Sequence, residues 1–154
     1  MLTEAAKGVY TIAVTPFLPN GAIDFDSVDR VVDFYIEQGA TGLTILGMMG
    51  EAGKLSAEES MRVVNRVIAR SSVPVVVGVS APGYAAMESL SKSSMDAGAA
   101  GVMVAPTTNL RSDDQIIEYY HGVANILGAT PFVLQDFPLA TSVTIATKVI
   151  QQII

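Results

Sequence analysis

The sequence predicts an α/β fold in which strands and helices alternate. Five short apolar runs, rich in β-branched residues, each precede a segment with helical periodicity. The strand-plus-helix unit recurs about every thirty residues, which is the size of a βα unit. The run at residues 74–79 is continuously apolar, as expected of a parallel strand that is covered on both faces. Half of the residues are apolar and 16% are charged, so the chain can bury a sizeable core.

The first unit begins with a strand-like run between residues 8 and 17. Pro19, Asn20 and Gly21 mark the turn that follows. The next segment is predicted to be a helix that ends near Gly39. Its apolar residues recur at helical spacing: Val28, Val31, Val32, Tyr35 and Ile36.

The second unit has a strand at residues 42–46 and a helix that opens at Ser56. Ser56 and Glu59 have the spacing of a capping box, in which each side chain satisfies a backbone N–H of the other residue. A second capping box is predicted at residues 112–115. The other expected strands and helices span residues 74–79, 84–97, 101–105, 112–128, 131–134 and 141–154.

The turn Gly47-Met48-Met49-Gly50-Glu51 follows the second strand. Two glycines bracket it, which allows two backbone N–H groups to point the same way. In α/β folds, small anionic ligands bind at the carboxyl ends of strands. The turn is therefore a candidate anion site, and the alternative is an ordinary loop between a strand and a helix.

Composition excludes several classes of function. The net charge of −6 argues against a nucleic-acid or anionic-membrane partner, and no apolar run is long enough to span a membrane. No secretory signal is visible, and the absence of cysteine fits a cytoplasmic protein. His121 is the only histidine, so neither a multi-histidine metal site nor a Ser-His-Asp triad is expected. No cofactor is expected either.

Two architectures agree with right-handed connections between parallel strands. An open, doubly wound sheet of five strands suits the length of 154 residues. A (β/α)₈ barrel normally needs about 250 residues. Length favours the open sheet, and the alternating pattern does not decide between them.

Several short segments, in order and spacing, bear on that choice. They are Thr15-Pro16-Phe17, Gly21-Ala22-Ile23-Asp24, Gly39-Ala40-Thr41-Gly42, Gly47-x-x-Gly50-Glu51 with Leu55 and Glu59, Pro74-Val75-Val76-Val77-Gly78-Val79, Ala97-Gly98-Ala99-Ala100-Gly101, Val104-Ala105-Pro106 and Asp136-Phe137-Pro138. Together they resemble the dihydrodipicolinate synthase / N-acetylneuraminate lyase family of class I aldolases. The family fold is a (β/α)₈ TIM barrel. The resemblance therefore implies that residues 1–154 form a partial TIM-barrel domain with the first five βα units.

The resemblance also implies a chemistry. Family members condense or cleave 2-oxo acids such as pyruvate through a Schiff base with a lysine on the sixth strand, which lies beyond this chain. The lysines present lie outside strand interiors, where burial would make an amine nucleophilic; they are Lys7, Lys54, Lys92 and Lys148. In the family, the backbone amides at the positions of Met48 and Met49 hold the carboxylate of the 2-oxo acid.

Four departures from the family pattern concern the site. Met48 and Met49 replace a threonine pair that supplies a hydroxyl to a proton relay. Gln135 stands at the position of a tyrosine, and an amide does not titrate. Ala140 stands at the position of an arginine that binds a dicarboxylic partner. Thr107 and Thr108 replace an aromatic pair at a dimer interface. Asp136 is a polar residue beside Gln135, and strand alternation favours its pointing away from the barrel axis.

These departures predict a lyase, aldolase or dehydratase of altered specificity that is not a true dihydrodipicolinate synthase. The first alternative is a non-catalytic family member that binds a small carboxylate or serves only assembly. The second is an open-sheet binding domain, which would show strands in switched order. Since family members are commonly tetramers, a homo-oligomer is expected. The bare chain is predicted not to be a stable monomer, because two strand edges and the inward face of the barrel would be uncovered.

Overall fold

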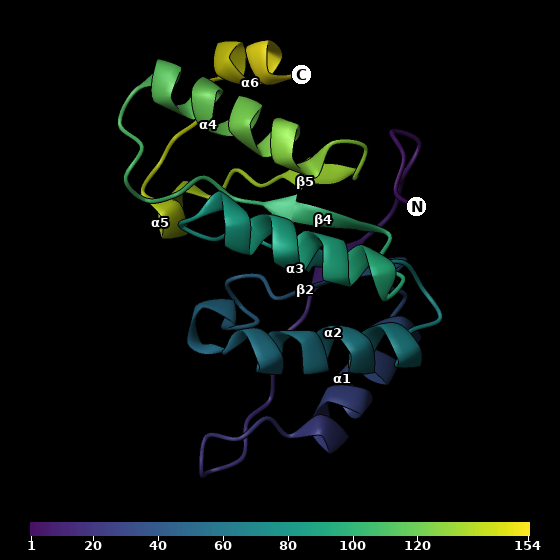
Figure 1. The fold of residues 1–154 in the computed structure, drawn as a ribbon. Helices are drawn as coiled ribbons and strands as arrows, with labels where there is room; N and C mark the ends of the chain where they lie inside the picture. Colours follow the sequence, from purple (N-terminus) through teal and green to yellow (C-terminus); the bar gives the residue numbers. More distant parts are fainter.

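The computed structural model describes residues 1–154 as a five-stranded parallel sheet with helices packed along it (Figure 1). The elements follow in the order β1 (Tyr10–Ile12), α1 (Phe25–Glu37), β2 (Gly42–Ile45), the 3₁₀ turn η1 (Ala52–Lys54), α2 (Ala57–Arg70), β3 (Val75–Gly78), α3 (Tyr84–Asp96), β4 (Gly101–Val104), α4 (Asp113–Leu127), β5 (Phe132–Leu134), α5 (Pro138–Thr141) and α6 (Thr147–Ile153). None of these helices combines the length and the hydropathy needed to cross a membrane.

The order of the strands in the sheet decides between the two architectures. Neighbouring strands pair in parallel in the order β1-β2-β3-β4-β5, which is also their order in the sequence. Each main helix packs on the next, α1 on α2, α2 on α3, α3 on α4 and α4 on α6 (Figure 1). A doubly wound sheet would reverse its strand order at a switch point. The sheet is therefore part of a barrel, and the open-sheet alternative is wrong.

Alternation along the strands divides the buried residues between two faces. Leu43, Val77 and Val102 are fully buried and pack in one hydrophobic cluster with side chains from the helices. Thr44 and Val76 occupy the intervening positions, are paired in register, and lie outside that cluster. The strands are thus covered on both faces, as the continuous apolar runs predicted.

The inward face is less exposed than the sequence led us to expect. Thr44, Val76 and Met103 are each at most 6% exposed, although they line a cavity of about 720 Å³ together with residues of the segment before β1. Exposure is confined to the edge of the sheet, where Val133 of β5 is 40% exposed. The prediction of an uncovered inward face therefore holds at β5 and is wrong for the central strands.

The two predicted capping boxes differ in the structure. At the start of α2, the Ser56 hydroxyl accepts from the Glu59 N–H at 3.2 Å, and the Glu59 carboxylate accepts from the Ser56 N–H at 2.9 Å. At the start of α4, Ser112 accepts from the Gln115 N–H, but the Gln115 side chain accepts from the N–H of Arg111 instead. The first box is confirmed, and the second is only half of a box.

Two predicted elements are shorter than expected. The run at residues 8–17 forms a strand only at Tyr10–Ile12, although the Ala13 N–H still bonds Thr44 O at 2.8 Å. The helix predicted at residues 141–154 forms only at Thr147–Ile153 (α6), and Thr141 is instead the last residue of the short helix α5. Ser142 between them has a left-handed φ of 57°, which stops α5. Val143 and Ile145 follow in the connection and are buried, so tertiary packing overrides local helix periodicity.

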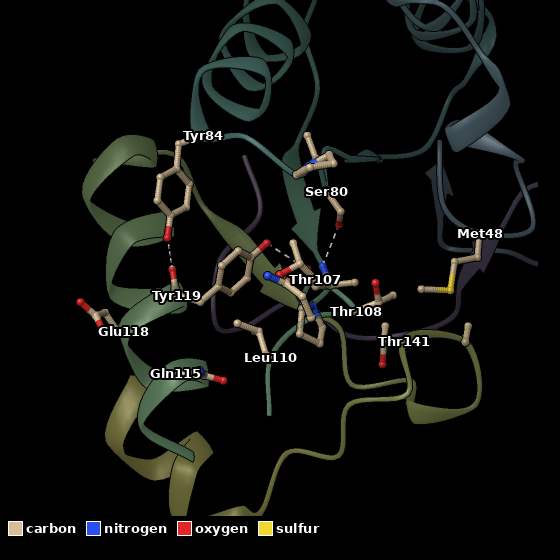
Figure 2. Close-up of a pocket in the computed structure, with 16 residues that line it drawn as sticks. Met48, Ser80, Tyr84, Thr107, Thr108, Leu110, Gln115, Glu118, Tyr119 and Thr141 are labelled. Carbon is tan, nitrogen blue, oxygen red and sulfur yellow. Dashed lines mark hydrogen bonds between the residues drawn. The ribbon is translucent and has the colours of Figure 1, made fainter. Parts of the chain in front are cut away.

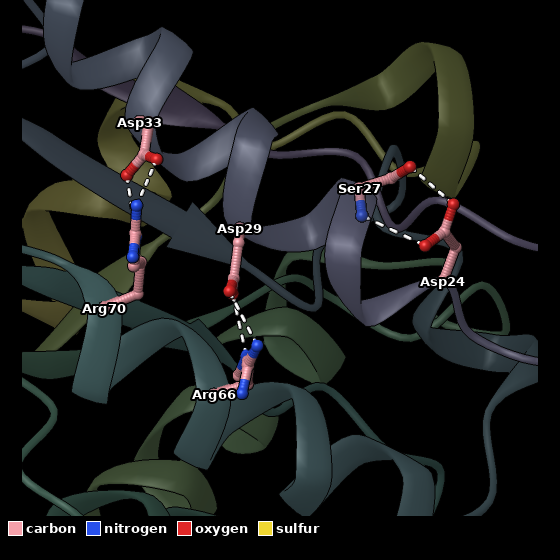
Figure 3. A network of polar contacts seen from close by, with 6 residues as sticks. All are labelled: Asp24, Ser27, Asp29, Asp33, Arg66 and Arg70. Carbon is pink, nitrogen blue, oxygen red and sulfur yellow. Dashed lines mark hydrogen bonds and ion pairs between the residues drawn. The ribbon is translucent and has the colours of Figure 1, made fainter.

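Two bidentate ion pairs join α1 to α2 (Figure 3). Arg66 holds both carboxylate oxygens of Asp29, at 2.7 and 2.6 Å, and Arg70 holds Asp33 in the same way. Hydrogen bonds from Arg70 lower the pKa of the Asp33 carboxyl, and the Asp33 carboxylate raises the pKa of Arg70. The two ion pairs fix the first two units relative to each other. Within the first unit, Asp24 caps the start of α1 by accepting from the Ser27 N–H at 3.0 Å.

Replacing Ser94 by alanine is expected to stabilise the protein. Ser94 in α3 is fully buried and its hydroxyl has no hydrogen-bond partner. An unsatisfied buried hydroxyl costs on the order of 1 kcal/mol, so S94A should raise the free energy of unfolding by about that amount in urea titrations of the complete protein. Ser91 is the matched control, because it is equally buried in the same helix but donates to Met87 O at 2.7 Å. An equal or larger gain from S91A would contradict this explanation.

Candidate functional site

The turn after β2 adopts an unexpected backbone conformation. Its left-handed residues are Leu46 (φ 53°) and Glu51 (φ 54°), whereas Gly47 and Gly50 have no positive φ. A non-glycine residue in this region costs about 1 kcal/mol. The left-handed conformations of the turn are therefore not at its glycines. Gly50 is needed for space, because a Cβ there would lie 3.2 Å from both the Ala13 carbonyl oxygen and the Leu46 nitrogen.

Neighbouring strands hold this turn in place. The buried Thr15 hydroxyl donates to the Gly50 carbonyl oxygen at 2.7 Å, which ties the turn to the segment after β1. On the other side, Gly78 at the end of β3 lies against the Leu46 carbonyl, and any Cβ at Gly78 would overlap that oxygen. The strained backbone is thus held by tertiary contacts on both sides.

The backbone amides of the turn are free. None of the N–H groups of residues 46–50 donates a hydrogen bond to another group of the protein. Gly47 and Gly50 are buried, while the side chains of Met48 and Met49 are 40% and 59% exposed. Successive backbone N–H groups without a protein partner can form an anion-binding concavity, so the turn is a candidate anion site.

A cavity of about 520 Å³ opens beside the turn, at the carboxyl ends of β2 to β5. It is lined by Leu46, Gly47, Met48, Glu51, Ala52, Gly53, Lys54, Gly78, Ser80, Met103, Ala105 and Gln135. We call this the amide-turn cavity. Of the predicted site residues, it brings together Gly47, Met48 and Gln135. Met49 and Gly50 do not line it, and neither does Asp136.

A second cavity, of about 840 Å³, shares Met48, Ser80 and Ala105 with the first and lies between the loops that follow β3, β4 and β5 (Figure 2). We call it the loop cavity. It is lined by Met48, Ser80, Ala81, Pro82, Tyr84, Ala105, Pro106, Thr107, Thr108, Asn109, Leu110, Gln115, Glu118, Tyr119, Ala140 and Thr141. Of the positions that depart from the pattern of the resemblance, Met48 lines both cavities and Gln135 lines the amide-turn cavity. Thr107, Thr108 and Ala140 line the loop cavity, and Met49 lines neither.

Hydrogen bonds organise the wall of the loop cavity. The Ala105 N–H donates to the Ser80 hydroxyl at 2.8 Å, and Ala105 O accepts from the Tyr119 hydroxyl at 3.1 Å (Figure 2). Tyr84 stacks on Tyr119 with 6.1 Å between ring centroids, and its hydroxyl donates to Tyr119 O. The sequence reasoning did not single out Ser80, Tyr84 or Tyr119 as site residues. The position of Ser80 and Tyr84 just after β3 was the available signal.

These tyrosines do not act as proton donors in place of the tyrosine that the resemblance implies at the position of Gln135. Burial, with a smaller contribution from Tyr84, raises the pKa of Tyr119 to about 12, and its hydroxyl is already bonded to a backbone carbonyl. Burial also raises the pKa of Tyr120, whose hydroxyl donates to Val104 O; nearby Tyr119 and then Asp136 contribute less. The only acid and base lining the amide-turn cavity are Glu51 and Lys54, which form an ion pair with each other.

Comparison with known proteins identifies the family. The sequence profile described as "Dihydrodipicolinate synthetase family" matches residues 5–154. The chain belongs to this family. A 4-hydroxy-tetrahydrodipicolinate synthase of Sorangium cellulosum is 37% identical over 151 residues, covering 96% of the chain and 50% of the relative. The chain thus spans about half the length of the curated relatives that it matches.

Solved structures of family members agree with this assignment. A dihydrodipicolinate synthase from Rhodopseudomonas palustris matches with a TM-score of 0.95 and 52% identity, over 99% of this chain and 51% of that one. A chloride-inhibited synthase from Acinetobacter baumannii, solved in complex with pyruvate, matches with a TM-score of 0.82 and 28% identity, over 92% of this chain and 50% of that one. The five βα units therefore correspond to part of the family's TIM barrel.

Proposed function

We propose that the complete protein is a lyase, aldolase or dehydratase that acts on a 2-oxo acid through a lysine Schiff base. The lysine would come from outside these 154 residues, because the lysines present lie on the surface: Lys54, Lys92 and Lys148 form surface ion pairs with carboxylates, and Lys7 precedes β1.

 The side chains of Lys54, Lys92 and Lys148 are 75%, 76% and 72% exposed, so none of them is the buried amine that Schiff-base chemistry requires.

The free amides of the turn carry this proposal. A carboxylate placed against the N–H groups of Met48 and Met49 would satisfy donors that have no partner within the chain. Backbone donors do not depend on the identity of the side chain, so methionine can stand where the family has threonine. The resemblance implies that pyruvate or another 2-oxo acid binds here, and the pyruvate complex of the Acinetobacter baumannii relative supports that class of ligand.

The proposed specificity differs from that of dihydrodipicolinate synthase. Gln135 reaches the amide-turn cavity and can orient a substrate by donating and accepting hydrogen bonds, but it cannot transfer a proton as a phenol does. Ala140 lines the loop cavity without a charge where the synthase has an arginine. A dicarboxylic partner would therefore lack its usual cation. These residues support a different substrate, although the named relatives are synthases.

A non-catalytic role is the second candidate. It is favoured by the side chains of the amide-turn cavity, whose only titratable groups, Glu51 and Lys54, neutralise each other. In that case the turn would bind a carboxylate without chemistry. In either case, we propose a homo-oligomer, as the resemblance implies, and a cytoplasmic location, which the absence of cysteine fits.

Reductive trapping separates the two candidates. The complete gene product is incubated with pyruvate and borohydride, and its intact mass is measured. If the enzyme hypothesis is correct, the mass increases by one reduced pyruvate per subunit at a single lysine, which peptide mapping should place outside residues 1–154. Absence of an adduct with pyruvate and with longer 2-oxo acids would leave the non-catalytic candidate.

A further inference from the structure

The amide-turn cavity contains one cationic side chain, Lys54, which is paired with Glu51. Lys54 is the only basic residue that lines either this cavity or the loop cavity. We propose that Lys54 binds a second carboxylate of the substrate, located beyond the 2-oxo acid group that the turn holds. This inference rests on the function proposed above and adds a determinant of substrate choice.

The backbone places Lys54 close to the free amides. Glu51 N–H donates to Met48 O at 3.1 Å, and Lys54 N–H donates to Glu51 O at 2.8 Å. Lys54 is the last residue of η1, which begins directly after Glu51. Two successive turns therefore connect the amide of Met48 to Lys54, and both residues line the same cavity. A ligand held by the amides would have the ammonium group on the adjoining wall.

The ammonium group has donors available for a ligand. Its one partner is the Glu51 carboxylate three residues earlier, and the Lys54 side chain is 75% exposed. An ammonium group has three N–H donors, so one bond to Glu51 leaves two. A substrate carboxylate can therefore bind beside Glu51 without breaking the ion pair. Exposure also leaves the long side chain free to adjust its position.

The other nearby cation is already used by the protein. Arg111 follows the loop after β4, but its guanidinium donates to Thr108 O at 2.6 Å and to Leu110 O at 2.9 Å. It lines neither cavity. Ala140 provides no charge on the loop-cavity side of Met48. A second carboxylate would therefore be recognised from the η1 side, opposite to where the synthase has its arginine.

The test compares two 2-oxo acids that differ only in the second carboxylate. The dissociation constants of 2-oxoglutarate and 2-oxopentanoate are measured by titration calorimetry on the complete protein and on K54M. We expect K54M to bind 2-oxoglutarate about tenfold more weakly, as for loss of one charged hydrogen bond, and 2-oxopentanoate unchanged. K54R should retain most of the affinity. K92M is the matched control, because Lys92 pairs with Asp96 in α3 and lines neither cavity.

The outcomes distinguish this inference from the proposed function. If K54M weakens the binding of both ligands equally, or of neither, Lys54 does not bind the second carboxylate and the inference is overturned. If the unmodified protein forms the pyruvate adduct in that case, the proposed function still stands. If it forms no adduct and binds no 2-oxo acid, the proposed function fails and this inference fails with it.

Discussion

The isolated 154-residue chain is expected to associate or aggregate rather than to unfold cooperatively as a monomer. β1 pairs only with β2 and β5 only with β4, so each outer strand presents unpaired backbone groups on one side. Apolar side chains of β5 and of the segment that follows it are also exposed, since Val133, Phe137 and Leu139 are 40%, 42% and 89% exposed. Unpaired edges with exposed apolar residues favour contacts between chains.

Size-exclusion chromatography with light scattering, followed by urea unfolding at several protein concentrations, tests this expectation. The isolated chain should elute as oligomers or aggregates, and its unfolding should depend on concentration. The complete gene product, measured in parallel, is the control. A monomer of 154 residues with a single, concentration-independent unfolding transition would show that the unpaired strand edges do not cause the chains to associate.

Replacing Gly78 by alanine is expected to damage both the fold and the site. A Cβ at Gly78 would overlap the carbonyl oxygen and carbon of Leu46, which are backbone atoms that cannot move aside like a flexible side chain. Overpacking of this kind costs about 3 kcal/mol in the free energy of unfolding. Because the displaced carbonyl belongs to the left-handed residue that begins the turn, 2-oxo acid binding should also weaken, by about tenfold or more.

Urea unfolding of the complete protein and calorimetric titration with pyruvate, under conditions where the variant remains folded, measure these two effects. Gly53→Ala is the matched control for stability, because a Cβ there would meet no atom within 4 Å. If G78A is as stable as G53A and binds pyruvate as tightly as the unmodified protein, the close approach of β3 to Leu46 does not shape the turn.

Much of the fold could be predicted because its signals are local. The capping box of Ser56 and Glu59 joins residues three positions apart, and the structure has both of its hydrogen bonds. The helix over Val28 and Val32 follows from periodicity, and both residues are buried. The prediction of the last helix was wrong at its start, because tertiary packing, and not helical periodicity, determines the conformation of Ser142 and the burial of Val143.

The candidate site was predicted less completely than the fold. The motif at Gly47–Gly50 located the turn, but the left-handed residues proved to be Leu46 and Glu51. Ser80 and Tyr119 were missed as wall residues because their roles depend on contacts with Ala105, which is 25 and 14 residues away in the chain. No local pattern encodes such contacts.

By itself, the sequence determined the alternation of strands and helices, the family, and the residue types at the departing positions. Those properties depend on residue identity and on spacings of a few residues. Only the tertiary structure decided the sequential strand order, the strained turn and the division of the site around Met48. The Thr15–Gly50 hydrogen bond joins residues 35 positions apart. A Cβ at Gly78, the last residue of β3, would overlap the carbonyl oxygen of Leu46, the residue after β2. The turn takes its shape from neighbouring strands, because their contacts hold a backbone conformation that its own residues disfavour.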